Sequence, residues 1–358
     1  MNIQCVKTIG KLSDAFGPSG FEDDVVNIIK EQVEKLGTVQ EDCLRNLYLY
    51  RKENTGNKPI LMLDAHTDEV GFMIHSIKPD GTLKFVLLGG WNRNALQGTR
   101  VLIKNKSNKF IKGIIEGKPL HLVKRTDSLT TQQNENELYI DIGARSSEEV
   151  KEAFQIERGA FAAPEGFFSY DVKNGLLFGK AFDCRIGCAA LIETLKLIEG
   201  KTYPFDIVAT FTSQEEVGDR GCKLAVNRVQ PQAAICFEGA PADDVGVESS
   251  SIQTAIKKGS MFRYMDKSII CNPRFMRFIL NVAEEEHLPV QTSVRENGGN
   301  NGSAIYTAAN GVPVVVAGIP VRHIHSAQSI ATMEDFNYAV CIVVKVIERL
   351  TVESVNGF

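Results

Sequence analysis

The fold is decided around residues 59–69, which read PILMLDAHTDE. The apolar run from Ile60 to Leu63 predicts a buried strand, and His66 stands where that strand leaves the core. A histidine two residues before an aspartate, here Asp68, can bind a metal while the carboxylate fixes its tautomer. Taken alone, such a pair is more typical of a structural histidine, so its meaning depends on the rest of the chain.

Four further strand-like runs also end in residues of metal-ligating types. They lead to Asp183, to the adjacent pair Glu215 and Glu216, to Glu238, and to His325. In a doubly wound sheet, ligands bind beyond the carboxyl ends of the strands. The sequence therefore predicts that two imidazoles and four carboxylates meet at one edge of a sheet.

This predicted cluster favours a pair of divalent metal ions. Carboxylates at close range disfavour one another's ionisation, and cations between them remove that conflict. Imidazole and carboxylate ligands suit zinc, with cobalt and manganese as alternatives. Two metals roughly 3.5–4 Å apart need one bridging carboxylate. The other member of an adjacent glutamate pair can then stay unligated and move protons.

Outside residues 70–166 the chain alternates between helical patterns and apolar runs. Alternation of this kind predicts a mostly parallel, doubly wound α/β sheet with helices on both faces. Residues 1–69 and 167–358 are expected to form this domain. The helical patterns cover 6–16, 25–36, 184–198, 218–228, 273–286, 303–310 and 333–350, and the clearest apolar runs are 60–63, 207–211, 233–237 and 312–317.

The segment 70–166 has a different character. Short β runs follow one another and are separated by turn signals such as Pro79-Asp80-Gly81. We expect an inserted β-barrel domain with one helix, near residues 147–154.

Composition excludes several classes of partner. The 358 residues carry a net charge of −4 without a basic block, so we expect no nucleic-acid partner. No apolar run reaches membrane-spanning length, and the amino end lacks the features of a signal peptide. Eight dispersed cysteines are typical of reduced thiols in a cytoplasmic protein.

Five strings follow one another along the chain: AHTDEVGFM, KAFDCRIGC, TSQEEVGDRGC, AAICFEG and IPVRHIHS. They resemble those of the tetrahedral and glutamyl aminopeptidases, a metallopeptidase group often labelled cellulase M or endoglucanase. The resemblance covers essentially the whole chain, including the insert segments IEGKPLHL and LYIDIGARSSEEV. It implies a di-zinc peptidase type of α/β domain with a barrel that serves in dimer contacts. It also implies hollow tetrahedral dodecamers in the cytoplasm that remove amino-terminal residues from peptides.

The resemblance also implies a role for each site residue. His66 and Glu238 would bind one metal, Glu216 and His325 would bind the other, and Asp183 would bridge them. Glu215 would be the general base for a water held between the metals. Asp68 would accept a hydrogen bond from the His66 ring nitrogen that faces away from the metal. The peptide bond from Asp183 to Cys184 would be cis.

Two neighbouring histidines compete for the last ligand position. Alternation along an extended strand would place His323 and His325 on the same side. The His-Ser pair of the resemblance favours His325, so His323 is expected in the pocket wall or beside the ligands.

Three positions depart from the family pattern. Glu238 stands where aspartate is usual, and it offers equivalent oxygen ligands. Cys184 stands where a second aspartate often follows the bridging one. Asn301 stands where the family has the aspartate of a Gly-Thr-Asp segment, which removes a possible anchor for a substrate ammonium group.

Other functions remain open at this point. A glycanase, as the family label suggests, would need two carboxylates facing each other across a sugar and no metal pair. A non-catalytic, metal-stabilised assembly protein would have no use for an unligated carboxylate such as Glu215. Serine or cysteine nucleophile chemistry is disfavoured, since no GxSxG motif is present.

Overall fold

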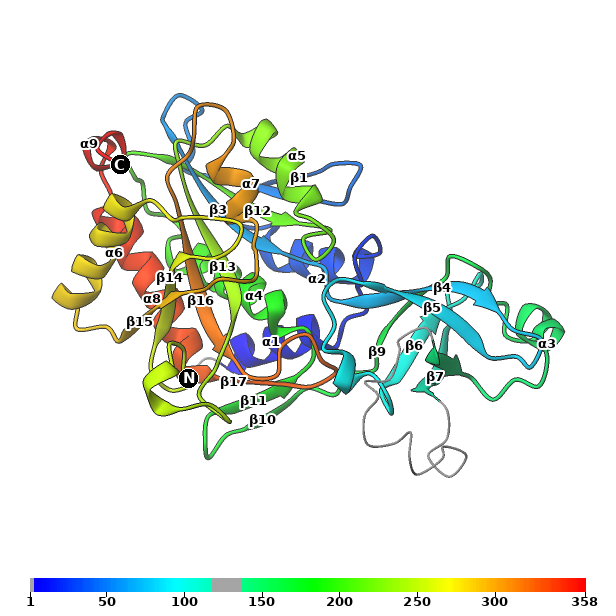
Figure 1. Ribbon diagram of the computed structural model, residues 1–358. Helices are drawn as coiled ribbons and strands as arrows, with labels where there is room; N and C mark the ends of the chain where they lie inside the picture. Colours follow the sequence, from blue (N-terminus) through cyan, green and yellow to red (C-terminus); the bar gives the residue numbers. More distant parts are fainter. Residues whose placement is uncertain (1–2, 118–136) are drawn as a thin grey trace.

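The computed structural model describes residues 3–117 and 137–358 (Figure 1). The part of the IEGKPLHL segment from 118 onward lies outside these residues. The described helices are α1 Ile3–Asp14, α2 Asp23–Val33, α3 Ser147–Glu152, α4 Phe182–Leu197, α5 Arg220–Val229, α6 Pro273–Glu285, α7 Gly302–Tyr306, α8 Met333–Arg349 and α9 Val352–Asn356. The strands are β1 Gly37–Glu41, β2 Leu47–Arg51, β3 Ile60–His66, β4 Gly71–Ile77, β5 Leu83–Leu88, β6 Arg100–Lys104, β7 Phe110–Glu116, β8 Tyr139–Asp141, β9 Phe161–Pro164, β10 Ser169–Asp171, β11 Leu176–Gly179, β12 Asp206–Thr212, β13 Ala233–Pro241, β14 Ser260–Met265, β15 Val290–Val294, β16 Val314–Val321 and β17 Ser329–Thr332.

The large sheet has a parallel centre and antiparallel margins. Its strand order is β1-β2-β12-β3-β13-β16-β14-β15. Strands β12, β3, β13 and β16 run parallel, whereas β2 pairs antiparallel with β12, and β14 pairs antiparallel with β16. All seven residues of β12 are buried, as are all eight of β16, because helices cover both faces. The carboxyl ends of the four central strands therefore lie at one edge.

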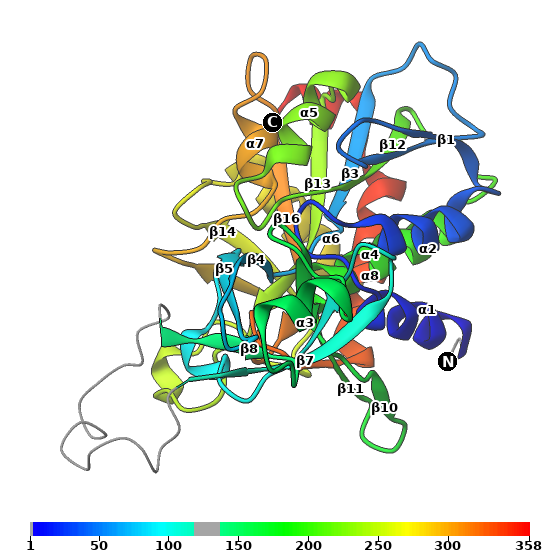
Figure 2. The same cartoon turned by 90° about the vertical axis from the view of Figure 1, so that its right-hand side faces the viewer.

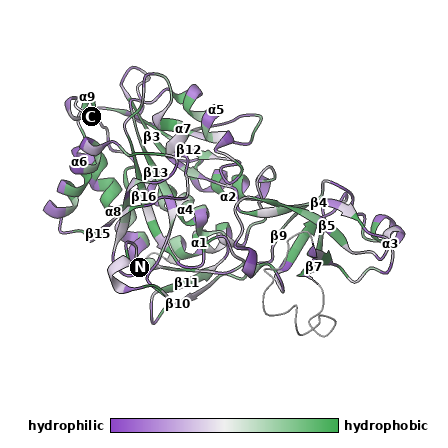
Figure 3. Ribbon diagram, in the orientation of Figure 1, coloured by the Kyte–Doolittle hydropathy of each residue, from purple (hydrophilic) through white to green (hydrophobic). Residues whose placement is uncertain are grey.

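Helices pack on both faces of this sheet (Figures 1 and 2). Helices α1, α2, α4, α6 and α8 contribute to a large apolar core on one face, and α5 and α7 contribute to a smaller one on the other. The hydrophobic colour concentrates on the central strands and the inner sides of the helices (Figure 3). This is the α/β layer arrangement that the alternation predicted.

Local signals explain where the long helices begin. The Asn272 side chain accepts hydrogen bonds from the first turn of α6, and Pro273 occupies the first helical position. The Thr332 hydroxyl accepts from the backbone N–H of Asp335 at 3.1 Å and caps α8. On α8, Phe336, Val340 and other apolar residues at helical spacing then face the core.

The inserted segment forms a closed antiparallel barrel with the order β4-β5-β8-β7-β6-β9. Its interior holds Phe72 stacked on Trp91, with ring centroids 4.6 Å apart, and the Trp91 indole donates to the Gly71 carbonyl at 3.0 Å. The barrel projects to one side of the α/β domain (Figure 1). The predicted fold class, a doubly wound sheet with an inserted β-barrel, is confirmed.

The sequence patterns missed the short, half-exposed strands. Strand β11 belongs to a separate antiparallel sheet with β10 and β17. Strand β15 buries only one of its five residues, so it lacks the apolar run that revealed the central strands. Within residues 3–117 and 137–358, no helix combines the length and the apolar character that crossing a bilayer requires.

Candidate metal centre

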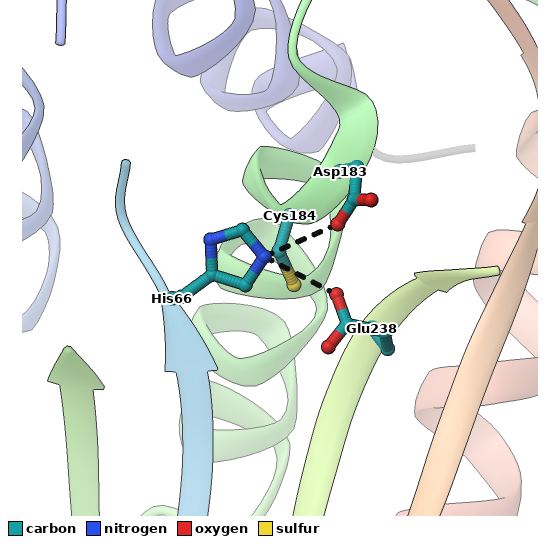
Figure 4. Close-up of side chains that lie close together, drawn as sticks. All are labelled: His66, Asp183, Cys184 and Glu238. Atoms are coloured by element: carbon teal, nitrogen blue, oxygen red, sulfur yellow. Dashed lines mark hydrogen bonds and ion pairs between the residues drawn. The ribbon is translucent and has the colours of Figure 1, made fainter. Parts of the chain in front are cut away.

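The end of β3 presents His66 to two carboxylates. Its Nε2 atom lies 3.1 Å from Oδ1 of Asp183 and 3.3 Å from Oε1 of Glu238. Figure 4 shows the three side chains converging from β3, from the start of α4 and from β13. His66 is 1% exposed. The arrangement is a cluster of one imidazole and two carboxylates in which His66 and Glu238 are buried and Asp183 is partly exposed.

A second imidazole meets the other oxygen of the same aspartate. Nε2 of His325 lies 3.2 Å from Oδ2 of Asp183 and 3.3 Å from Oε1 of Glu216. The two oxygens of Asp183 therefore face two different histidines, each of which also faces a glutamate. The structure brings all five predicted metal ligands together.

Asp183 reaches this position by a route that strand patterns did not anticipate. It was expected to follow a strand of the main sheet, but β11 lies in the small antiparallel sheet and Asp183 stands in the first turn of α4. Ala181, two residues earlier, has a left-handed backbone with φ 53°, which turns the chain sharply into the helix. The Asp183-Cys184 peptide bond is cis, as the resemblance implied.

The His325 position also depends on a turn. The expected alternation of His323 and His325 does not apply, because β16 ends at Val321 and both histidines are left-handed, with φ 59° and 55°. His323 is exposed and does not line the cavity beside the site, so its expected place in the pocket wall is wrong. The Nδ1 atom of His325 lies 2.6 Å from the Gly90 carbonyl, which orients the ring.

Asp68 holds the neighbouring glutamates through their backbone. Its carboxylate accepts from the N–H groups of Glu215 at 2.9 Å and Glu216 at 3.1 Å. It also lies 3.4 Å from Nδ1 of His66. Glu215 is the more distant acid, with Oε2 3.9 Å from Nε2 of His66. One buried carboxylate thus links a histidine to both members of the glutamate pair.

Ser19 is a functional neighbour that the sequence reasoning missed. Its hydroxyl donates to Oδ2 of Asp68 at 2.6 Å, and the residue is 4% exposed. The only local signal was the helix-stopping run from Gly17 to Gly20, which predicts a turn but does not indicate which residue Ser19 contacts. Ser19 completes the set of donors that hold Asp68 in place.

A buried arginine fixes this turn against the site. Arg185, on α4, donates to the backbone carbonyls of Leu12, Gly17 and Thr67 and to the carboxylate of Glu69. Every one of these groups is removed from water, so the pairing is needed to offset the desolvation of the guanidinium. The helix that carries Asp183 is thereby tied to the strand end that carries His66.

Electrostatics show how crowded the acids are. Burial, followed by the charge of Asp183, raises the pKa of Glu238 to about 7. Burial is also the first cause that raises the pKa of Glu215 well above its usual range. Burial alone would lower the pKa of His66, but the acidic groups around it raise that pKa well above its usual range. The acids therefore disfavour one another's ionisation, and divalent ions between them would remove that conflict.

The donor set fits a pair of metals. The described residues form three groups of possible ligands, and within each group the ligand atoms lie within 4.8 Å of one another. Each group contains His66 or His325 together with at least two residues that carry a carboxylate or a thiol. Oε1 of Glu216 is buried and accepts no hydrogen bond from the described residues, and its nearest ionisable neighbour is the His325 imidazole at 3.3 Å. A buried carboxylate oxygen without a well-formed hydrogen bond is unfavourable, and a cation between it and the imidazole would satisfy both groups.

Cys184 lies close to this donor set without an assigned role. Its sulfur belongs to the group that includes His66, Asp183 and Glu238 (Figure 4). The thiol donates to the Phe237 carbonyl at 3.2 Å, and burial raises its pKa well above its usual range. A protonated thiol bonded to the backbone is a packing group, so we do not count it among the ligands.

The Asn301 side chain faces the protein interior. Its Nδ2 donates to Oδ2 of Asp64 and to the Thr212 hydroxyl, both at 2.7 Å, and the residue is 2% exposed. The idea that this position anchors a substrate ammonium group is therefore wrong. An amide here provides the donor that the buried Asp64 needs, and a second carboxylate would not.

A cavity of about 740 Å³ opens beside the cluster. Asp183, Glu215, Glu216, Glu238 and His325 line one end of it. Its other wall comes from β14, from the segment 294–299 and from Ile324. A ligand of several residues' length has room to reach the cluster from solvent.

Comparisons with known proteins all find peptidases. The profile of the M42 glutamyl aminopeptidase family matches residues 46–342. The glutamyl aminopeptidase of Lactococcus lactis subsp. cremoris is 31% identical over 346 residues, which cover 96% of each chain. The crystal structure of a TET aminopeptidase from a marine sediment archaeon of the Thaumarchaeota superposes with a TM-score of 0.94 at 34% identity and covers 99% of this chain and 98% of its own. The Pyrococcus horikoshii TET1 peptidase, which can assemble into a tetrahedron or a large octahedral shell, gives 0.84 at 26% identity and covers 97% of this chain and all of its own.

Proposed function

The chain belongs to the M42 glutamyl aminopeptidase family and is a metal-dependent aminopeptidase. We propose that it works with two divalent ions bridged by Asp183. The observation that carries this proposal is the position of Asp183, whose two oxygens face two different imidazoles at 3.1 and 3.2 Å. A site for one metal would not need two histidines on opposite oxygens of one carboxylate.

We assign the ligands by these contacts. His66 and Glu238 would hold one ion, and Glu216 and His325 would hold the other. Zinc is the expected metal, with cobalt and manganese as alternatives, because imidazole and carboxylate ligands suit all three. When bound, the two ions would lower the pKa of a water between them enough for attack on a peptide carbonyl near neutral pH.

The chain's own residues would then orient the reactants and move the proton. Glu215 is near the cluster, lines the cavity and is the acid farthest from the imidazoles, so it can act as base and afterwards protonate the leaving amine. Asp68 would keep the His66 ring in one tautomer, with Ser19 and two backbone N–H groups fixing the carboxylate.

The activity can be tested with peptides that differ only at the amino end. The metal-reconstituted protein should release the first residue of a free peptide and leave its N-acetylated form intact, read by mass spectrometry. A chelator should abolish the release, and added zinc, cobalt or manganese should restore it. Hydrolysis of a soluble glucan that survives the chelator would instead support the glycanase that the family label suggests.

We also propose that this protein assembles with copies of itself in the cytoplasm and that its barrel, residues 70–166, supplies contacts. Outward-facing apolar side chains support the barrel's part, since Val86 is 44% exposed and Ile114 is 49% exposed. Such side chains favour association. The eight free cysteines, six of them buried, support a reducing compartment.

Assembly can be tested by one substitution on the barrel surface. Ile114→Glu should shift the protein to smaller particles in analytical ultracentrifugation, because a charge would have to be buried in the contact. Ile114→Val is the matched control and should sediment as the wild type does. A wild-type protein that sediments as a monomer would rule out the assembly itself.

A further inference from the structure

The two histidines of the metal cluster are held from different parts of the chain. His66 is supported inside the α/β domain, where Oδ1 of Asp68 lies 3.4 Å from its Nδ1 atom. His325 is supported from the inserted barrel instead. Its Nδ1 atom lies 2.6 Å from the Gly90 carbonyl, and its own carbonyl accepts from the backbone N–H of Asn92 at 3.1 Å. One half of the cluster therefore depends on the turn that follows β5.

This turn is anchored in the barrel at one end and touches the cluster at the other. Trp91 is 7% exposed, and its ring stacks on Phe72 inside the barrel. The Asn92 side chain caps the short 3₁₀ helix Arg93–Ala95. Gly90 lines the cavity beside the proposed metal ligands. The buried tryptophan thus fixes a segment whose backbone reaches the cluster.

Gly89 packs directly against Glu216, which is proposed to bind the same ion as His325. Its φ is +85°, a backbone conformation that favours glycine. A Cβ atom at this position would lie 3.1 Å from both Cβ and Oε2 of Glu216 and 2.7 Å from Cγ1 of Val70. These separations are shorter than ordinary van der Waals contacts, so a larger residue would displace the Glu216 side chain or the turn itself.

We propose that the turn of residues 89–92 positions Glu216 and His325, so that the inserted barrel completes the binding site of one metal ion within the same chain. The inference rests on the proposed function, because that function assigns these two ligands to one ion. A carbonyl that accepts from Nδ1 holds the imidazole in one orientation and keeps Nε2 free for a metal. His66 and Glu238 lie on β3 and β13 of the α/β domain, so the ion between them should not depend on the turn.

Gly89→Ala tests the contact with Glu216. The full-length protein is freed of metal and titrated with Co²⁺, and binding is followed by calorimetry and by the visible absorption of the bound cobalt. We expect two binding events in the wild type. In the variant, one event should weaken by about 10- to 100-fold, the usual effect of changing a group that supports a metal ligand. The other event should keep its affinity.

Gly98→Ala is the matched control. Gly98 belongs to the same barrel and has nearly the same backbone, with φ +83°, but a Cβ atom there would meet nothing within 4 Å among the described residues. The variant adds the same methyl group in the same strained conformation, and it should bind both ions as the wild type does. Glu216→Gln identifies the affected ion. It should lose the ion of Glu216 and His325, and adding Gly89→Ala to it should leave the affinity for the remaining ion unchanged.

Two variants of Asn92 test the turn without adding volume beside Glu216. Asn92 has φ −69°, an angle that proline adopts, so Asn92→Pro removes the N–H that donates to the His325 carbonyl and keeps this angle. Asn92→Ala removes the same side chain and keeps the N–H. We expect Asn92→Pro to weaken the same binding event as Gly89→Ala, by about 10-fold, and Asn92→Ala to leave both events unchanged. Thermal unfolding in EDTA establishes that each variant is folded without metal.

Each failure has a distinct meaning. A wild type that binds a single ion would overturn the two-metal proposal and this inference with it. A wild type with two ions, together with a folded Gly89→Ala that binds both as tightly, would overturn this inference alone. Equal weakening of both ions in Gly89→Ala, or the same loss in Gly98→Ala, would also overturn it, because the turn would then act only through the fold. If Gly89→Ala does not fold, equal affinities in Asn92→Pro and Asn92→Ala would overturn the inference.

Discussion

Asp183→Ala should leave the protein almost free of metal at both positions. The side chain is proposed to contribute one oxygen to each ion, so its loss removes a ligand twice. Changes around metal ligands, without loss of a ligand, typically lower metal affinity by about 10- to 100-fold. We therefore expect affinity at each position to fall by about 100-fold or more, and peptide hydrolysis to become undetectable.

Elemental analysis after dialysis measures this directly. The wild type should hold two ions per chain and the variant fewer than one. Asp206→Ala is the control, because Asp206 is a buried aspartate that accepts from the backbone N–H groups of Thr55 and Gly56, away from the site. Circular dichroism establishes that both variants are folded. Two ions per chain in folded Asp183→Ala would refute the bridging assignment.

Glu215→Gln should lower kcat by about 10²–10⁴-fold, the usual contribution of a general acid–base group. The amide has the shape of the carboxylate but cannot accept and return the proton. Because Glu215 is not assigned as a ligand, the variant should keep both metals. The KM for the substrate should change little, because the metals and the rest of the cavity lining are unchanged.

The adjacent residue provides the control. Glu216→Gln alters a proposed ligand whose Oε1 lies 3.3 Å from Nε2 of His325. It should lose metal from one position, whereas Glu215→Gln should not. Turnover of aminoacyl anilides is measured alongside metal content for both proteins. A fully metallated Glu215→Gln that is nearly as fast as the wild type would exclude Glu215 as the base.

Much of the candidate site was predictable because its residues follow long buried strands. The run before His66 and the run before Glu238 are apolar for at least four residues, and their strands β3 and β13 pair directly in parallel. Strands of this kind end at a common edge, so the two side chains had to be near each other. The resemblance of the five strings then supplied a role for each residue, and the geometry is compatible with those roles.

The predictions that failed all concerned residues beyond the end of a regular element. His323 and His325 were treated as strand residues, but both have a left-handed backbone. Asp183 was treated as a strand end, but it enters from a helix after a separate small sheet. Sequence periodicity predicts side-chain direction only where φ and ψ repeat from residue to residue. A single left-handed residue ends that regularity, so the direction of the side chains after it cannot be predicted from the pattern.

The sequence by itself determined the alternation of elements, the insertion of a barrel and the residue types at the strand ends, because these depend on local hydrophobic spacing. The tertiary structure alone decided which groups share a cavity. The Asn301 side chain faces inward to Asp64 although the sequence suggested a place near the substrate, and Arg263 of β14 lines the cavity although no sequence pattern indicated it. The reason is physical: a buried polar group must find its partner in space, and that partner is usually distant along the chain. Only the packed sheet places Arg263 of β14 and Glu238 of β13 in the lining of one cavity.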